Sequence, residues 1–154
     1  MKTLLLFLCL FSLSLSVYAQ EYKVVTIVES IVPAGLGRSR IIDNKTDVNV
    51  KDFTTERVNG KESSQDDVKR SGVKVDTFSE TKLLNFFSIA GINFQNIASN
   101  DAVITSKMNE LAKDGWKLAF VTSGVESDAG VDDGEGIFIT RLIFSRAEKG
   151  DKIP

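Results

Sequence analysis

The side chains that most often carry out catalysis are scarce in this chain of 154 residues. It contains no histidine, and its single cysteine is Cys9. Without these residue types, neither the Ser-His-Asp nor the Cys-His arrangement of nucleophilic catalysis can form beyond residue 9, and the preferred ligands of zinc and copper are missing. Carboxylate, lysine, hydroxyl and backbone chemistry remain. We therefore expect a protein without catalytic residues, metal ligands or cofactors.

Carboxylates gather in one short stretch, SDAGVDDGEG, at residues 127–136. Its four acidic residues are Asp128, Asp132, Asp133 and Glu135. Calcium prefers oxygen ligands of this kind, but the Asp-x-Asp-x-Asp-Gly order of a calcium loop is missing. The stretch also lies between two predicted antiparallel strands, so we interpret it as a solvated hairpin loop. A carboxylate pair that hydrolyses glycosidic bonds stays as an alternative, although no spacing selects one pair.

A glycine-rich step, GLGRSR at residues 35–40, follows the first predicted strand. The dinucleotide-binding fingerprint would need a third glycine at position 40, where the chain has Arg40, and no clear helix follows. We therefore predict a turn. Arg38 and Arg40 could still clasp an anion, because the guanidinium group matches the geometry of carboxylates and phosphates. Solvated arginines on a strand are the favoured interpretation.

The stretch NFFSIAGINFQNIASN, at residues 85–100, alternates amides with aromatic and aliphatic side chains. One interpretation is that the amides cap turns and satisfy neighbouring backbone groups, which is common chemistry for asparagine. The other is a cleft in which amides and aromatics bind a small polar ligand such as a glycan or a peptide. The candidate ligand-binding residues are Arg38, Arg40, Asn85, Asn93, Gln95 and Asn96. We favour turn chemistry for the amides.

The elements that would position these residues follow from the pattern of apolar side chains. Residues 21–33 are rich in β-branched residues and predict a strand, and residues 38–43 can return as its hairpin partner. Residues 43–80 form a long polar insertion of mixed charge, with a strand near residue 50 and a helical turn at 63–71. A helix and two further strands are predicted at residues 101–114, 116–125 and 137–146. The expected fold is α+β, with an antiparallel sheet of four or more strands and one main helix packed on one face.

The predicted helix has recognisable ends and one apolar face. Ser99 or Asn100 can cap its start, and Asp101 favours the positive end of the helix dipole. Three apolar residues recur at helical spacing on one face, namely Ile104, Met108 and Leu111. Gly115 ends the helix. We therefore expect this face to pack on the sheet.

The only tryptophan, Trp116, lies where this helix meets the next strand. Gly115 suits the left-handed position after a helix end, and a Schellman ending would then bring Trp116 onto Leu111. Alternation along the strand places Trp116, Leu118 and Phe120 on one side. We interpret Trp116 as a residue that fills the core rather than one that binds a ligand. The predicted structural core residues here are Leu111, Gly115, Trp116 and Phe120.

Three stretches resemble a family of small bacterial domains of unknown function: EYKVV in the first strand, LAKDGWKLAFV across the helix–strand junction and FITRLIFSR at the end. The family pattern is a Tyr-Lys-Val-Val strand, a helix ending in Gly-Trp-Glu-Leu and a closing strand ending in Phe and Arg. This chain departs from the pattern at Lys117, where the family usually has Glu, and in its large insertion. The resemblance implies a small α+β fold and brings no established catalytic residues.

The first residues are typical of a signal peptide. Lys2 precedes an apolar run at residues 4–17 that is too short to span a bilayer comfortably, and cleavage is predicted between Ala19 and Gln20. No second apolar run is long enough to cross a membrane. We expect an exported protein, periplasmic or extracellular, with one domain at residues 20–148 and a flexible tail at 149–154. A net charge of −2 does not indicate a nucleic-acid partner.

Both faces of the predicted sheet are apolar. In the closing strand one side carries Phe138, Leu142 and Phe144, and the other carries Ile137, Ile139 and Ile143 around Arg141. One helix can cover only one face, and a large apolar patch is rarely left bare. The second face could be covered by residues 83–97 of the same chain or by a second copy in a homodimer. We favour the internal cover.

The function expected from these patterns is that of a non-catalytic exported module that acts through protein–protein contacts or self-association. The alternative is a binder of a small polar ligand that uses residues 85–100. A carboxylate-dependent hydrolase ranks below both.

Overall fold

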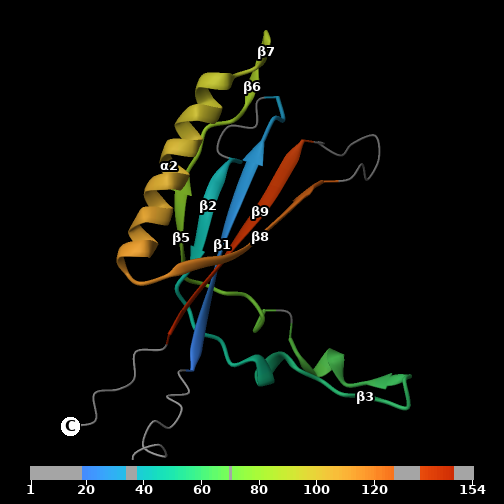
Figure 1. Cartoon of the computed structure of the whole chain (residues 1–154). Helices are drawn as coiled ribbons and strands as arrows, with labels where there is room; N and C mark the ends of the chain where they lie inside the picture. The colour runs from blue at the N-terminus through green and yellow to red at the C-terminus, as the bar shows by residue number, and fades with distance from the viewer. Residues whose placement is uncertain (1–18, 34–37, 70, 127–135, 148–154) are drawn as a thin grey trace, which may run out of the picture.

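Two long strands, β1 (Gln20–Ser30) and β9 (Ile137–Ala147), pair along their whole length at the centre of the fold (Figure 1). Their β-branched residues suit a pleated sheet that is packed on at least one side. The computed structural model describes residues 19–33, 38–69, 71–126 and 136–147. Among these residues, no helix is both long and apolar enough to cross a bilayer.

Three shorter strands complete an antiparallel sheet in the order β5-β2-β1-β9-β8. β2 (Arg40–Asn44) pairs with β1, β5 (Phe78–Lys82) pairs with β2, and β8 (Lys117–Val125) pairs with β9. The helix α2 (Phe94–Lys113) lies across one face of this sheet (Figure 1). The predicted α+β fold, one main helix on an antiparallel sheet, is confirmed.

The polar insertion ends earlier than predicted, because residues 78–82 form the edge strand β5. The strand expected near residue 50 is wrong: the 3₁₀ helix η1 (Val50–Phe53) is there, and the Asn49 side chain accepts a hydrogen bond from the Lys51 N–H. A second 3₁₀ helix, η2 (Gln65–Asp67), lies within the predicted helical turn. Between them, β3 (Arg57–Val58) and β4 (Glu62–Ser63) form a hairpin. These segments project from one end of the sheet (Figure 1).

The helix starts seven residues earlier than predicted. Its N-cap is Asn93, whose side chain accepts a hydrogen bond from the Asn96 N–H at 3.1 Å. The predicted cap, Asn100, lies inside the helix and is buried, because its amide bonds to both backbone groups of Leu84. Asparagine usually favours helix ends over helix interiors, so the helix start predicted from Asn100 was too far along the chain. A tertiary contact keeps Asn100 in the helix.

The helix ends in a Schellman motif, as its sequence predicts. Gly115 has a φ of 86°, and its N–H donates to the Ala112 carbonyl at 3.0 Å. The Trp116 N–H donates to the Leu111 carbonyl, also at 3.0 Å. These are the two backbone bonds of that motif, which also brings the side chains of its first and last residues together. Trp116 is 8% exposed and Leu111 is 4% exposed, so both belong to the core.

The expectation that Trp116, Leu118 and Phe120 share a buried side is wrong. Leu118 is paired with Phe144 and Phe120 with Ile143, so Ala119 is an extra residue in β8. A β-bulge of this kind shifts the alternation by one residue and turns the next side chains to the opposite face. Phe120 is 69% exposed and is not a core residue.

The hydrophobic core lies between α2 and one face of the sheet, here called the helix-side face. It is built from Val25, Ile27, Ile41, Leu83, Leu111, Trp116, Leu142 and Phe144, with Val103, Ile104 and Met108 packed against it. Residues that alternate with these along the strands point to the other face, here called the open face. The helix therefore covers one face only, as predicted.

The internal cover predicted for the open face is wrong. Residues 83–97 form the small hairpin β6 (Phe87–Ser88) and β7 (Gly91–Ile92) and the first turn of α2. Phe86, Ile92 and Ile97 lie beside Phe138 and Thr140, whose side chains belong to the helix-side face. This segment is tied there by backbone bonds, including Phe86 N–H to the Ser30 carbonyl at 2.8 Å. The open face has no cover from this segment.

Candidate functional site

The open face of the sheet carries apolar side chains from all five strands. They are Tyr22, Val24 and Val28 of β1, Ile42 of β2, Phe78 of β5, Phe120 of β8, and Ile139 and Ile143 of β9. Each is exposed or only partly buried. Four strand spacings of about 4.8 Å and a length of roughly 20 Å give a face on the order of 400 Å² in plane. This is the area of the whole face, which also carries Arg40, Glu80 and Lys82 at the β5 edge. Exposed groups of apolar side chains often mark interaction sites.

Arg141 lies in the middle of the open face. Ile139 and Ile143 flank it along β9, and Thr26 and Thr122 are its register partners on the two neighbouring strands. Its side chain is exposed, and within the described residues no carboxylate forms an ion pair with it. Arginine is enriched at the centres of protein interfaces, where its charge meets a carboxylate of the partner. The open face is thus apolar with one cation at its centre.

An apolar groove lies on the helix-side face, where α2 leaves β8 and β9 bare. It has a volume of about 570 Å³. Its floor includes Ser123 and Val125 of β8 and Phe138 and Thr140 of β9, and its wall is formed by Phe86, Ile92 and Ile97. β8 borders this groove and is exposed along its whole length.

One carboxylate, Glu29, lines the same groove. Its Oε1 atom accepts a hydrogen bond from the Asn100 amide at 3.3 Å. Burial raises the pKa of the Glu29 carboxyl above its ordinary value, the Asn100 hydrogen bond opposes this, and the nearby Asp101 charge adds to it. An apolar wall disfavours the charged form of a carboxyl group, so burial is the main cause of the raised pKa of Glu29.

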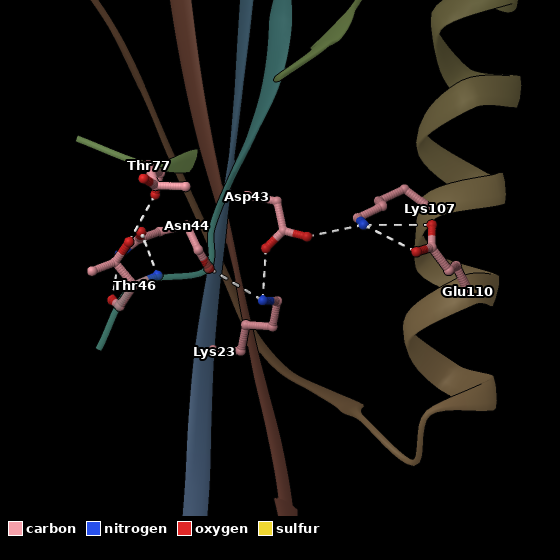
Figure 2. Close-up of polar contacts among 7 residues, drawn as sticks. All are labelled: Lys23, Asp43, Asn44, Thr46, Thr77, Lys107 and Glu110. Carbon is pink, nitrogen blue, oxygen red and sulfur yellow. Dashed lines mark hydrogen bonds and ion pairs between the residues drawn. The ribbon is translucent and has the colours of Figure 1, made fainter. Parts of the chain in front are cut away.

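A polar cleft of about 580 Å³ lies at the opposite end of the helix, where a four-residue ion cluster joins α2 to the sheet (Figure 2). Asp43 of β2 is at its centre and is almost fully buried. The Lys23 ammonium lies 2.6 Å from Asp43 Oδ1, and the Lys107 ammonium lies 2.9 Å from Oδ2. Oδ1 has no donor in good hydrogen-bond geometry, so the Lys23 contact is an ion pair. Lys107 also contacts Glu110 at 3.4 Å.

The charges in this cluster hold each other in their ionised forms. Burial alone would raise the pKa of the Asp43 carboxyl, but the ammonium groups of Lys23 and Lys107 outweigh burial and keep that pKa below its ordinary value. Burial alone would lower the pKa of Lys107, but Asp43 and Glu110 raise it above its ordinary value. A general acid or base works best with a pKa near the working pH. Both pKa shifts move the titration of Asp43 and Lys107 further from neutral pH, so these groups suit a structural ion pair between α2 and the sheet.

At the other wall of the cleft, the start of β1 and the end of β9 meet the C-terminal end of α2. The Arg146 guanidinium lies 4.2 Å from the centre of the Trp116 ring and 2.7 Å from Glu21 Oε2. It also donates to the Asp114 carbonyl at the end of α2, at 3.4 Å. The arginine at the end of the closing strand therefore caps the helix and covers the tryptophan. Its contacts are those of a packing residue.

The amides of residues 85–100 bond mainly to the protein's own backbone. Asn93 caps α2, Asn85 donates to the Val32 carbonyl at 3.0 Å, and Asn96 donates to the Asn85 carbonyl at 2.7 Å. Gln95 is exposed on α2. None of these amides lines the apolar groove. Asn85, Asn93 and Asn96 therefore act in turns and in a helix cap, which is the interpretation favoured from the sequence.

The two candidate arginines lie apart from these amides. Arg40 of β2 pairs with Glu80 of β5 at 2.6 Å, on the open face at the edge of the sheet. Arg38 is exposed beside β2. The acidic stretch with Asp128, Asp132, Asp133 and Glu135, like residues 35–37 of the glycine-rich step, lies outside the described residues. Within the described part of the chain, no cluster of three or more acidic or cysteine side chains is placed to hold a metal ion.

Comparison of the chain with protein-family models, curated proteins and solved structures finds no match. The resemblance to the small bacterial domains therefore stays a prediction.

No sequence pattern predicts the ion cluster, because Lys23, Asp43 and Lys107 come from three distant segments and share no motif. Arg141 left a visible signal. It is the one charged residue inside the apolar run IFITRLIF, on the side that the helix does not cover. A charge within a strand that is apolar on both sides is a sign of a surface that functions in contact with something else.

Proposed function

We propose that this protein is a non-catalytic exported module that acts through protein–protein contacts made by the open face. The observation that carries the proposal is the broad apolar face around Arg141, which no helix of the described residues covers. At the polar cleft, Asp43 is paired with Lys23 and Lys107, and Glu21 is paired with Arg146, which suits a structural role. The partner surface is expected to be apolar and to bring one carboxylate to Arg141.

The proposal includes export, which would place these contacts outside the cytoplasm. β1 begins at Gln20, the residue that the predicted cleavage would leave at the N-terminus. Cleavage there would leave all the described strands and α2 intact. Mass spectrometry of the exported protein is expected to find an N-terminus at Gln20, and intact Met1 on cytoplasmic protein would contradict export.

Site-specific photo-crosslinking tests the proposed contact surface. A photoreactive residue at Val24, on the open face, is expected to form a covalent adduct with a protein in cells that express the full chain. The same residue at Gln95, exposed on α2, is the matched control and is expected to form none. Arg141→Glu is expected to reduce the Val24 adduct at least tenfold. The substituted carboxylate would repel the carboxylate that the partner is expected to bring to this position.

The outcome that contradicts the proposal is equally specific. No adduct at Val24 in cells, together with a monomeric purified protein whose Ile139→Asp variant behaves as the wild type in light scattering, would remove the open face as a contact surface. Ile89→Asp, in the exposed β6–β7 hairpin, controls for the added charge.

A further inference from the structure

The two edges of the sheet are unlike each other. β5, at one edge, has five residues and carries Glu80 and Lys82. β8, at the other edge, has nine residues, contains no proline, and has Lys117 at its first position as its only charge. Natural sheets protect their edges with short strands, charges or proline, because an open edge readily pairs with another strand. By this criterion β5 is protected and β8 is open.

The backbone groups that β8 presents outward can be identified from one hydrogen bond. The Glu126 N–H donates to the Ile137 carbonyl at 2.9 Å, directly after the β8–β9 register ends. In an antiparallel ladder the residues that bond to one neighbour alternate with those that point away from it. Counting back from Glu126, the backbone groups of Phe120, Thr122 and Gly124 face β9. Those of Val121, Ser123 and Val125 face outward.

The bulge at Ala119 does not close this edge. The β8–β9 register is continuous from Phe120 to Val125, so the outward groups of Val121, Ser123 and Val125 keep the spacing of a regular strand. The side chains of the two valines lie on the helix-side face next to the apolar groove, and they are 56% and 63% exposed. A strand added here would gain backbone bonds and would cover these valines.

We propose that β8 pairs with β8 of a second copy of this chain, antiparallel and centred on Ser123. In this register Val121 lies opposite the partner's Val125, and Val125 lies opposite the partner's Val121, on the same face of the joined sheet. Ser123 meets its equivalent on the two-fold axis, where its small side chain fits. Each of these three facing pairs has outward N–H and carbonyl groups on both strands, so each exchanges two hydrogen bonds.

The position of the one charge in β8 favours antiparallel over parallel pairing of two copies. Antiparallel pairing about Ser123 puts the two Lys117 residues on the order of 40 Å apart, at about 3.3 Å per residue. Parallel pairing would bring them side by side. The contact is isologous, so it uses β8 of both copies and leaves the charged β5 strands at both outer edges. The assembly is therefore a closed dimer with both α2 helices on the same face.

The β8 edge is a different surface from the open face, so this pairing goes beyond the proposed function and does not depend on it. The open face remains free in the joined sheet, and joining two sheets extends it. A β8 dimer would thus present two copies of the Arg141 site on one continuous face. The two surfaces can be tested separately.

Amide hydrogen exchange gives the most direct test, because outward and inward amides alternate along β8. The protein is purified from cells that express the full chain and is measured at low and high concentration. The Val121, Ser123 and Val125 amides are expected to exchange at least tenfold more slowly at high concentration. The Phe120, Thr122 and Gly124 amides are expected to be protected throughout. A dimer by light scattering in which the first three amides stay fast would overturn the proposal, as would a monomer at every concentration.

Variants separate the edge from the open face. Ser123→Pro removes only an outward N–H, and Val121→Lys adds a gatekeeper charge, so both are expected to be folded monomers. Thr81→Lys, on the other edge strand, is the matched control and is expected to stay dimeric, as is Ile139→Asp on the open face. Circular dichroism checks that each variant folds, and the exchange test does not depend on them. If Ile139→Asp dissociates the dimer and Val121→Lys does not, the edge proposal is wrong and the proposed function stands.

Discussion

At the scale of single residues, the buried carboxyl of Asp43 and the partly buried carboxyl of Glu29 have pKa values shifted in opposite directions. Two ammonium groups lie beside Asp43, whereas Glu29 lies on an apolar wall, accepts a hydrogen bond from Asn100 and is near the like charge of Asp101. Desolvation acts in the same direction on both, so the neighbouring charges decide the sign of the net pKa shift. Stability should therefore depend on pH in opposite ways at the two positions.

Asp43→Asn is expected to destabilise the fold by about 1–3 kcal/mol at pH 7, because it leaves two ammonium groups without their counter-charge. The folded pKa of Asp43 is lowered, so its stabilising effect is present above the unfolded pKa of about 3.9 and is lost as pH falls through the folded pKa. The difference in unfolding free energy between wild type and variant should shrink below about pH 4. Urea denaturation at a series of pH values measures it. A difference that does not change with pH would contradict an ionised Asp43.

Glu29→Gln is expected to stabilise the fold at pH 7, since the neutral amide can still accept the Asn100 hydrogen bond. The folded pKa of Glu29 is raised, so ionisation destabilises the folded state as pH rises from the unfolded pKa of about 4.3 through the folded pKa. The gain should vanish below about pH 4, and at pH 7 it is opposite in sign to the loss expected for Asp43→Asn. Glu62→Gln, in the exposed β3–β4 hairpin, controls for loss of a charge. A variant less stable than wild type at pH 7 would show that the carboxylate is needed.

At the scale of elements, the ends of α2 and the bulge in β8 determine which side chains meet. The Schellman ending turns the chain from helix to strand within two residues and puts Trp116 over Leu111. The bulge at Ala119 then reverses the alternation, so Phe120 belongs to the open face and Val121 to the helix-side face. One inserted residue thus supplies an exposed aromatic ring to the proposed contact surface.

Gly115→Ala is expected to cost about 1–2 kcal/mol of unfolding free energy, because a φ of 86° forces a Cβ into the left-handed region. No atom lies within 4 Å of the added Cβ, so the cost comes from the backbone alone. Gly124→Ala, in β8, also has open space around the new Cβ and does not require a positive φ, so it is the matched control and should cost nothing. Equal effects of the two substitutions would contradict a conformational role for Gly115. Thermal unfolding of both variants measures this.

At the scale of the whole molecule, the insertion and the α+β domain are separable. Asn44 at the end of β2 and Phe78 at the start of β5 are register partners, so the insertion leaves and re-enters the sheet at neighbouring positions. The side chains of the hydrophobic core all come from outside residues 45–77. The insertion is therefore a long loop on a β2–β5 hairpin.

Replacing residues 45–77 with Asn-Gly, a turn suited to a two-residue hairpin, is expected to leave the fold intact. Loop-closure entropy favours the shorter connection, because each halving of loop length stabilises the fold by about 0.6 kcal/mol. The far-UV circular dichroism signal of the sheet and helix should persist, with a melting temperature no lower than that of wild type. Loss of cooperative unfolding would show that the insertion stabilises the sheet. The β8 and open-face tests can then be repeated in this shorter chain.

The sequence alone determined what depends on neighbours along the chain. Runs of apolar and β-branched residues predicted β1, β8 and β9, and Gly115 followed by Trp116 predicted the helix ending and its contact. These signals are local, because strand alternation and capping act over a few residues. The edge strand β5 was missed because its sequence, FSETK, is mostly polar and lacks the apolar pattern of a buried strand.

Only the tertiary structure decided the contacts between distant segments. Asn100 looked like a helix cap until its bonds to Leu84 placed it inside α2. Phe120 looked like a core residue until pairing with β9 revealed the bulge. Asp43 gained its charge partners from β1 and α2, and residues 83–97 were drawn to the helix-side face by backbone bonds to β1. In each case the deciding energy comes from a partner far away in the chain, and no local pattern encodes which partner that is.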